Sequence, residues 1–268
     1  MDRIVFESVR KVFRHRPALF NWVGRERGGE TVALKDVTFS AASGEVLALL
    51  GPNGSGKTTA LKLISTILLP DGGSVRVGGA DTRSDETAVR RQVGIAVASE
   101  RSFFPRLSAR ENLNFFATLD EVARGERAGR ISDVLGDTGL EEHAETLVMK
   151  FSSGMYQRLG IARALVKRPS ILLLDEPTRS LDAATAARFW TTIRRLASQG
   201  TTVLVATHNF AEGAAVADRV LLLHRGELLA DRHMRDGESA DGLRAFYFGL
   251  TGETDEAQST IHRAEAAR

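Results

Sequence analysis

The chain has 268 residues, of which 43% are hydrophobic and 26% charged, with a formal net charge of +2 and no cysteine. This balance is typical of a globular protein, and the small net charge argues against a polyelectrolyte that binds nucleic acid through its overall charge. Disulfides and thiolate metal sites are excluded. No apolar run approaches the roughly 20 residues of a membrane-spanning helix, so we do not expect the chain to cross a bilayer by itself.

The first part of the chain predicts strands that lead to a glycine-rich loop. Ile4–Phe13 alternates weakly and predicts an edge strand, and Thr31–Phe39 resumes the alternation after the irregular stretch Arg14–Glu30. Val46–Leu50 is an apolar run typical of a buried strand, and Thr58–Thr66 predicts a helix. The loop between the last two therefore has a strand before it and a helix after it.

This loop has the complete pattern G-x-x-x-x-G-K-[ST] of a phosphate-binding loop. Its glycines let successive backbone N–H groups turn toward a polyphosphate, and the helix N-terminus adds partial positive charge. We predict that Lys57 reaches the β- and γ-phosphates and that the Thr58 hydroxyl binds Mg²⁺. A glycine-rich turn without a ligand is the alternative, which the strand–loop–helix context disfavours. The predicted nucleotide-binding residues are Gly51, Pro52, Asn53, Gly54, Ser55, Gly56, Lys57, Thr58 and Thr59.

The middle of the chain predicts a hairpin, a strand and then a helical insert. Glycine pairs bracket a short strand at Ser74–Val77, and Val93–Ala98 is a further apolar strand. The pattern from Ser108 to about Lys150 is helical, and Ser152–Lys167 predicts another helix that Pro169 stops. The helical spacing is carried by Leu113, Phe116, Leu119 and Val122.

Strands and helices alternate again in the last third. Ile171–Leu174 is fully apolar, as in strands buried on both faces of a parallel sheet, and Asp182–Ser198 and Thr201–Ala206 predict a helix and a strand. Arg225-Gly226 predicts the turn of a hairpin, whereas Thr251–Arg268 is polar and is expected to fray. The alternation predicts an α/β fold with a helical insert in its middle.

Two carboxylates and a histidine follow strands of the predicted sheet. Asp175 and Glu176 come directly after the buried strand, at the edge where open parallel sheets bind ligands. Asp175 suits the Mg²⁺-holding role and Glu176 can take a proton from water. A helix cap plus a surface charge is the alternative for this pair. His208 follows the next strand, and we predict a γ-phosphate contact rather than a plain structural role.

A second candidate anion site opens the helix after residue 151. Ser152 and Ser153 are good helix caps, and Gly154 lets backbone approach a ligand. A helix N-terminus with hydroxyl groups can bind an anion. Simple capping is the alternative for these three residues.

Taken together and in this order, the segments resemble the nucleotide-binding subunit of an ATP-binding cassette (ABC) transporter, over roughly residues 4–235. The resemblance implies an α/β fold with a P-loop NTPase core of mostly parallel sheet, an antiparallel β subdomain and an inserted helical subdomain at about 108–168. It implies one ABC ATPase domain over 1–250, followed by a polar tail at 251–268.

The family also implies a head-to-tail homodimer that sandwiches two ATP molecules. By this resemblance Ser152 and Gly154, with Ser153 between them, grip the γ-phosphate bound to the other protomer. Glu176 is then the general base, and His208 steadies the γ-phosphate and the attacking water. Phe13 falls where the family places an aromatic side chain that stacks on adenine.

Two motifs depart from the usual family pattern. The signature, usually Leu-Ser-Gly-Gly-Gln, is Phe-Ser-Ser-Gly-Met at Phe151–Met155, which puts the glutamine's ribose-side contact in doubt. The glutamine-loop position holds Glu100, whose carboxylate can reach Mg²⁺ or can instead pair with Arg101. Both departures resemble the ATPases of ABC-2-type exporters, whose members move drugs, lipids or glycan polymers.

The resemblance implies an ATP- and Mg²⁺-dependent subunit that powers a separate integral-membrane permease from the cytoplasmic face of the cell membrane. Phe103–Leu113 resembles the stretch where the permease docks, with a buried hydrophobic staple as the alternative. Arg14–Glu30 mixes arginines with Phe20 and Trp22, and predicts contact with lipid headgroups or with the permease, with a solvated surface loop as the alternative. The alternative function is a soluble ABC-type ATPase acting on nucleic acid or the ribosome; such relatives usually carry two cassettes or a coiled coil, so no nucleic acid is expected.

Overall fold

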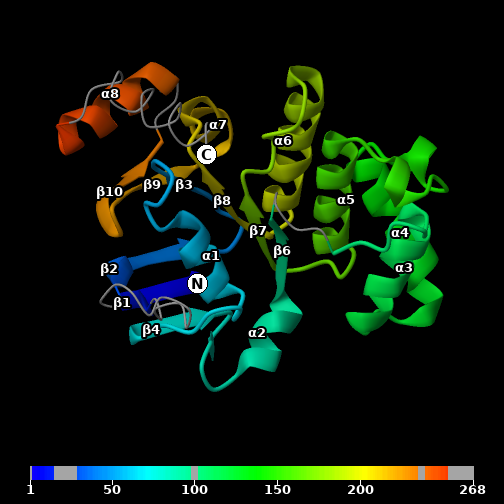
Figure 1. Ribbon diagram of the computed structural model, residues 1–268, viewed down its shortest axis with the longest axis horizontal. Coiled ribbons are helices and arrows are strands. Elements are labelled where there is room, and N and C mark those ends of the chain that lie inside the picture. The colour runs from blue at the N-terminus through cyan, green and yellow to red at the C-terminus, as the bar shows by residue number, and fades with distance from the viewer. Residues whose placement is uncertain (1, 15–28, 98–101, 235–238, 253–268) are drawn as a thin grey trace, which may run out of the picture.

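The structure is a computed structural model of the chain, described for residues 2–14, 29–97, 102–234 and 239–252. The described strands form two sheets, and a group of helices lies at one end of the molecule (Figure 1). Phe20, Trp22 and Glu100, for which the sequence predicts contacts with lipid and Mg²⁺, lie outside the described residues. Among the described residues, no helix combines the length and the apolar character that crossing a bilayer requires.

The larger sheet carries the predicted buried strands in the order β10-β9-β3-β8-β7-β6. The strands from β9 to β6 run parallel to one another, and β10 pairs antiparallel with β9. β3, β7 and β8 are buried along their whole length, as expected of parallel strands covered on both faces. The strands are β3 (Val46–Leu50), β6 (Val93–Val97), β7 (Ile171–Asp175), β8 (Thr202–Thr207), β9 (Arg219–His224) and β10 (Glu227–His233).

Apolar side chains on this sheet alternate between two cores. On β7, Leu172 and Leu174 belong to the core shared with the helical insert, whereas Ile171 and Leu173 belong to the core shared with the antiparallel sheet. The alternation follows from the period of two residues along a strand. The sheet is therefore the middle layer, and the loops at its carboxyl edge are held from both sides.

The smaller, antiparallel sheet corrects one prediction. Its order is β2-β1-β4-β5, so β1, predicted as an edge strand, lies between two partners. The weak alternation has a local cause: Ser8 has a φ of 49° and the register shifts between Phe6 and Val9, which is a bulge that breaks the period of two. Phe6 stacks on Phe39 at 4.5 Å between ring centroids. The strands are β1 (Asp2–Arg14), β2 (Glu30–Ala42), β4 (Gly72–Val77) and β5 (Ala80–Asp81).

The helical insert lies between β6 and β7 and forms the far end of the molecule (Figure 1). Its first helix ends earlier than the spacing predicts: Leu119 is the last helical residue and is 63% exposed, while Val122 is buried in the link that follows. Glu121, with a φ of 59°, reverses the chain there. The insert contains α3 (Ala109–Leu119), α4 (Arg124–Asp137), the 3₁₀ helices η1 (Glu141–His143) and η2 (Val148–Lys150), and the start of α5 (Ser153–Leu165).

Outside the insert the structure describes five helices, and three of them have no counterpart in the sequence prediction. Helices α1 (Lys57–Ile64) and α6 (Ala183–Ser198) were expected. Helices α2 (Glu86–Gln92), α7 (Phe210–Val216) and α8 (Ala240–Thr251) were not. Because α8 includes Thr251, the prediction that fraying begins there is wrong by at least one residue, and residues beyond 252 lie outside the described part.

Candidate functional site

The predicted phosphate loop joins β3 to α1 and adopts a conformation that only glycine accepts at several positions. Gly51, Gly54 and Gly56 have φ values of 155°, 77° and 110°. A Cβ on Gly56 would lie 2.7 Å from the Ala33 carbonyl oxygen, and one on Gly51 would lie 2.1 Å from the Leu223 carbonyl oxygen. The loop is thus pressed against two other strands, and its glycines are required for both conformation and space.

Polar groups of the loop point to an anionic ligand. Gly56 caps α1 without a side-chain hydrogen bond, and the first turn of the helix holds no acidic residue. The Ser55 hydroxyl is buried without a hydrogen-bond partner among the described residues. Lys57 Nζ donates to the Gly51 and Pro52 carbonyl oxygens at 2.7 and 2.9 Å. Burial lowers the pKa of Lys57, and the nearby carboxylates of Glu176 and Asp175 oppose that shift.

The predicted metal-binding pair is assembled at the base of the loop. Thr58 Oγ1 donates to Asp175 Oδ2 at 2.9 Å, which joins the start of α1 to the end of β7. Asp175 is 8% exposed, and burial raises its pKa, against the Thr58 hydrogen bond that lowers it. Hydroxyl and carboxylate oxygens are the hard donors that Mg²⁺ prefers, so this donor set fits the ion.

Glu176 and His208 meet directly at the neighbouring strand ends. His208 Nδ1 lies 2.7 Å from Glu176 Oε1, and the His208 backbone N–H donates to the same oxygen at 3.1 Å. Burial pushes the pKa of Glu176 upward, but hydrogen bonding and charge from His208, helped by Lys57, hold the pKa below its usual value. The hydrogen bond to Glu176 raises the pKa of His208 against its partial burial. Glu176 therefore lies in the site as a carboxylate whose orientation is fixed.

One cavity of about 580 Å³ brings most of the predicted groups together. Phe13 and Ala33 form one wall, which places an aromatic ring beside the phosphate loop as the resemblance implies. Asp175 and Glu176 also line the cavity. The loop residues lining the cavity are Asn53, Gly54, Gly56, Lys57, Thr58 and Thr59.

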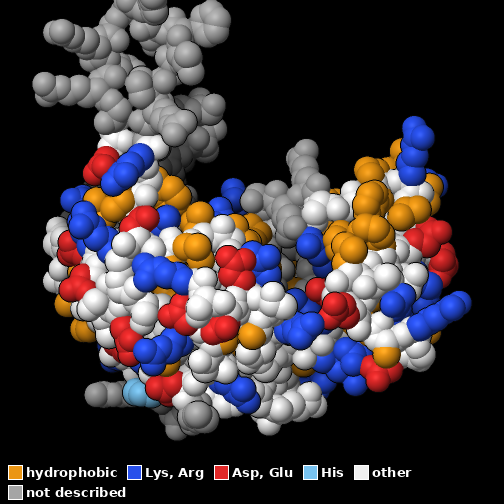
Figure 2. All heavy atoms as spheres, turned by 90° about the horizontal axis from the view of Figure 1, so that it is seen from below, with side chains coloured by type: hydrophobic (Ala, Val, Ile, Leu, Met, Phe, Trp, Pro, Cys, Tyr) orange, Lys and Arg blue, Asp and Glu red, His pale blue; other side chains and the backbone are white. Residues whose placement is uncertain are grey.

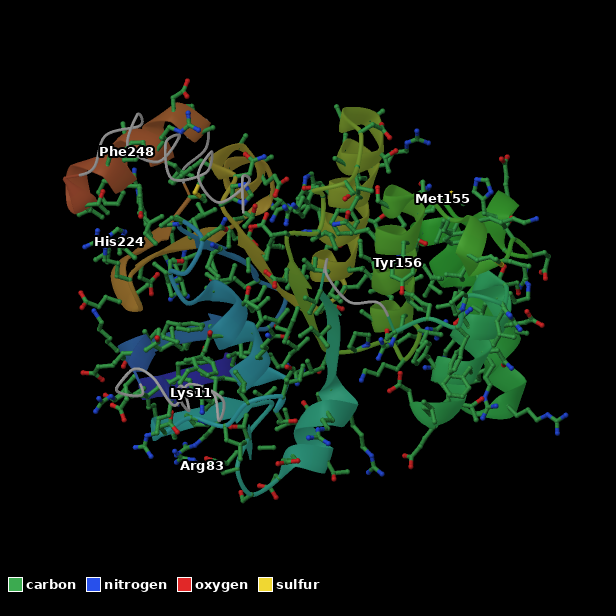
Figure 3. The ribbon with its side chains drawn as sticks, in the orientation of Figure 1. Lys11, Arg83, Met155, Tyr156, His224 and Phe248 are labelled. Carbon is green, nitrogen blue, oxygen red and sulfur yellow. The ribbon has the colours of Figure 1, made fainter. Side chains whose placement is uncertain are left out.

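The signature residues Ser152, Ser153 and Gly154 do not line this cavity. Ser152 caps α5 by accepting from the Met155 N–H at 3.2 Å, and both serines are exposed. Figure 3 shows Met155 at the end of α5 far from Lys11, which lies on the sheet that carries Phe13. Within one chain, the signature serines therefore lie outside the cavity that the phosphate loop lines.

The sequence prediction missed several residues that connect these parts. Gln157, on α5, donates to the Glu176 carbonyl oxygen at 2.8 Å and accepts from the Ser180 N–H at 3.1 Å. Thr207 and Glu212 form hydrogen bonds beside Glu176 and His208. Thr207 could have been singled out because it directly precedes His208 in the sequence. Gln157 could not, because it reaches Glu176 and Ser180 from α5 and such a long-range contact leaves no local sequence pattern.

The segment predicted to dock a permease has one buried and one exposed aromatic side chain. Phe103 is 7% exposed and packs edge-on against Phe116, whereas Phe104 is 44% exposed and contacts Phe115. Ser108 begins α3 with a reciprocal capping box. The segment thus has a buried and an exposed aromatic side chain on adjacent residues.

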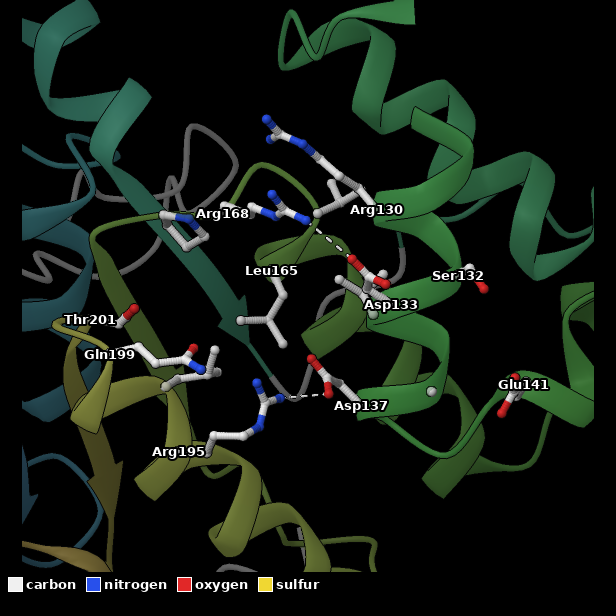
Figure 4. A pocket seen from close by; sticks show the side chains of 15 residues that line it. Arg130, Ser132, Asp133, Asp137, Glu141, Leu165, Arg168, Arg195, Gln199 and Thr201 are labelled. Atoms are coloured by element: carbon white, nitrogen blue, oxygen red, sulfur yellow. Dashed lines mark hydrogen bonds and ion pairs between the residues drawn. The ribbon is translucent and has the colours of Figure 1, made fainter. Parts of the chain in front are cut away.

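A larger cavity, of about 750 Å³, contains none of the predicted site residues. It lies between α4 of the helical insert and the end of α6 (Figure 4). Two ion pairs cross it: Arg168 contacts Asp133 at 3.1 Å, and Arg195 contacts Asp137 at 2.6 Å. Both pairs link α4 to the part of the chain that carries the larger sheet.

Comparison with known proteins agrees with the predicted family and with the fold. The family described as "ABC transporter" matches residues 34–179. The chain is 36% identical over 197 residues to ABC transporter ATP-binding protein NatA of Bacillus subtilis (strain 168), covering 74% of this chain and 80% of NatA. It is 33% identical over 238 residues to the daunorubicin/doxorubicin resistance ATP-binding protein DrrA of Streptomyces peucetius, covering 89% and 70%.

Among solved structures, a dimeric ATP-binding cassette in a post-hydrolysis state, bound to ADP and Pi, is similar. The TM-score is 0.75 at 28% identity, over 87% of this chain and 99% of that one. These likenesses confirm the predicted α/β architecture, with its parallel sheet, antiparallel sheet and helical insert. The chain belongs to the ABC transporter family and has the fold of its ATPase cassettes.

Proposed function

We propose that this chain is the ATP-hydrolysing subunit of an exporter and that it powers a separate integral-membrane permease. The observation that carries the proposal is the Glu176–His208 pair, set beside the Thr58–Asp175 pair at one edge of the sheet. A fixed carboxylate next to a phosphate loop is the arrangement that activates water for phosphoryl transfer.

Each side chain then has a distinct task. Lys57 and the amides of the phosphate loop bind the triphosphate, and Phe13 packs against the adenine. Glu176 accepts a proton from the attacking water, and His208 holds Glu176 in place. Thr58 and Asp175 hold Mg²⁺, which neutralises phosphate charge when it is bound. Glu100 is a further proposed ligand of this ion.

The separation of signature and phosphate loop supports a head-to-tail dimer. Ser152 and Ser153 are exposed and do not line the nucleotide cavity of their own chain, so in this proposal they contact the γ-phosphate of a second copy. The similar solved cassette is dimeric and holds ADP and Pi. In the proposed dimer, Ser152, Ser153 and Gly154 of one protomer close the cavity of the other.

An apolar surface on the helical insert supports docking to the permease. Figure 2 shows hydrophobic side chains gathered on the lobe that this insert forms. Phe104 and Phe115 are in edge contact, Leu119 lies one turn further along α3, and Met149 bonds through its N–H to Pro105. Contiguous exposed apolar side chains are typical of an interaction site. With Phe104, Phe115, Leu119 and Met149 against it, the permease would hold the chain at the cytoplasmic face of the membrane.

The names of the similar proteins favour a role in transport over the alternative of a soluble ABC-type ATPase acting on nucleic acid or the ribosome. NatA is named as an ABC transporter protein and DrrA as a drug-resistance protein. Another relative, 36% identical, is the Nod factor export ATP-binding protein I of Burkholderia thailandensis (strain ATCC 700388 / DSM 13276 / CCUG 48851 / CIP 106301 / E264). All three names describe ATP-binding proteins, and the Nod factor name adds export, which supports the proposed exporter subunit.

The proposal is tested with Glu176→Gln in membranes that contain the permease. We expect loss of phosphate release and of export with ATP binding retained, because the amide keeps the shape of the side chain but cannot take a proton. Glu121→Gln, at an exposed surface ion pair with Arg91, is the matched control and should behave as the unmodified chain. Undiminished turnover by Glu176→Gln would overturn the assignment of the base, and ATP turnover without export would overturn the coupling.

A further inference from the structure

Glu212 joins the two loops that carry Glu176 and His208. Thr178, two residues after Glu176, donates through its hydroxyl to Glu212 Oε1. Thr207, directly before His208, donates to Glu212 Oε2 at 2.8 Å. One carboxylate on α7 therefore takes hydroxyl hydrogen bonds from both sides of the site.

The direction of the Thr207 hydroxyl matters for Glu176. Thr207 Oγ1 lies 2.8 Å from Glu212 Oε2 but 3.4 Å from Glu176 Oε2, and it accepts from the Asn209 N–H at 3.1 Å. A hydroxyl has a single proton to donate, and the shorter contact receives it. With Glu212 present, the proton of Thr207 is therefore directed away from Glu176.

If Glu176 is to act as a base, one of its carboxylate oxygens must remain free of hydrogen-bond donors from the protein. Its Oε1 already accepts from the ring and the backbone of His208. A further hydrogen bond at Oε2 would occupy the oxygen that His208 leaves open to the attacking water. Oε2 is the oxygen that Thr207 would reach if its present acceptor were removed.

We propose that Glu212 is a positioning residue for ATP hydrolysis, which holds the two loops together and keeps the Thr207 proton off Glu176 Oε2, so that this oxygen can accept the proton of the attacking water. The inference rests on the proposed role of Glu176 as the base. Glu212 itself touches neither the nucleotide cavity nor the phosphate loop among their described lining residues. Its effect should consequently appear in kcat and not in nucleotide affinity.

The test is a double-mutant cycle between Glu212 and Thr207 in the full chain. Glu212→Ala should lower kcat about tenfold and change KM for ATP less than about twofold, because only the proton-transfer step loses efficiency. In the Thr207→Val background, which has no hydroxyl to redirect, the same change should cost no more than about twofold. If Glu212→Ala fails to fold, Glu212→Gln takes its place, with a smaller kcat decrease that Thr207→Val again suppresses.

The outcomes separate this inference from the proposed function. Equal costs of Glu212→Ala in the two backgrounds would overturn the redirected proton, and an unchanged kcat would overturn the positioning role. Both results leave the role of Glu176 intact as long as Glu176→Gln is inactive. If Glu176→Gln retains turnover, the proposed function fails first.

Discussion

The phosphate-loop edge and the signature helix are built in opposite ways. At the phosphate-loop edge, Lys57, Thr58 and Glu176 all have partners within the same chain, at distances between 2.7 and 2.9 Å. At the signature, Ser152 makes the capping bond to its own helix and remains exposed. The phosphate-loop edge is therefore assembled by folding of the single chain. The signature edge, which is the N-terminus of α5 with Ser152 and Ser153, presents its hydroxyl groups to the surface.

This difference shows what a single chain can and cannot complete. Side chains organised before the ligand arrives lose little freedom on binding, so nucleotide affinity should depend on the folded monomer. Water exclusion and the last γ-phosphate contacts should depend on a second copy. Binding and turnover are thus expected to respond separately to changes at the two edges.

The largest effect is expected from removing the lysine of the phosphate loop. Lys57→Ala should weaken ATP binding by about a hundredfold or more, because it removes a buried ammonium group aimed at the phosphates. Titration with a fluorescent nucleotide measures this, and Lys62→Ala near the end of α1 is the control. Tight ATP binding by Lys57→Ala would contradict the expectation that the phosphate-loop edge of the single chain sets nucleotide affinity.

A mixing experiment tests whether the second edge acts on another copy. Ser152→Asp keeps a good helix cap but places a negative charge where the γ-phosphate would lie, so turnover should be lost while monomer ATP affinity is retained. Mixed in equal amounts with Lys57→Ala, it should recover about a quarter of normal turnover, because half of the dimers then contain one intact site of two. Absence of any recovery would show that both edges act within the same chain.

The smallest effect concerns the Glu176–His208 pair and pH. Since the hydrogen bond to Glu176 raises the pKa of His208 above its usual 6.5, its stabilisation is fully present below that value and is lost as pH rises through the folded-state pKa. His208→Ala should therefore lower the thermal midpoint more at pH 6 than at pH 9. His208 is 40% exposed, so the difference should be small. In the Glu176→Gln background the pH dependence should disappear, and its persistence would assign the effect to another group.

The sequence predicted those parts of the fold and site that have local signals. The phosphate loop, the strands β7 and β8 to within one residue at each end, and the hairpin turn at Arg225 follow from glycine spacing and apolar runs. The position of β1 did not follow, because pairing with β2 and β4 is a long-range property and the bulge at Ser8 hid the alternation.

There are also physical reasons why the sequence did not predict α8 or the role of Glu212. α8 contains Gly242 and Gly249, which weaken its helical signal, and it is held by the burial of Leu243 and Tyr247 against other elements. Glu212 could not be singled out either, because a glutamate in the first turn of a short helix is ordinary there. Its partners are Thr178, in the loop after β7, and Thr207, the last residue of β8, and only the folded chain brings them together.

The two ion pairs that cross the larger cavity make ionic strength an experimental variable for this protein. Arg168–Asp133 and Arg195–Asp137 are partly exposed, and such pairs contribute about 0–1 kcal/mol each, an amount that salt reduces as the screening length falls from about 10 Å at 0.1 M to 3 Å at 1 M. They link α4 of the helical insert to the part of the chain that carries the larger sheet (Figure 4). Turnover rates measured in dilute and in concentrated salt therefore compare a more tightly tethered lobe with a looser one, even when nucleotide and magnesium are saturating.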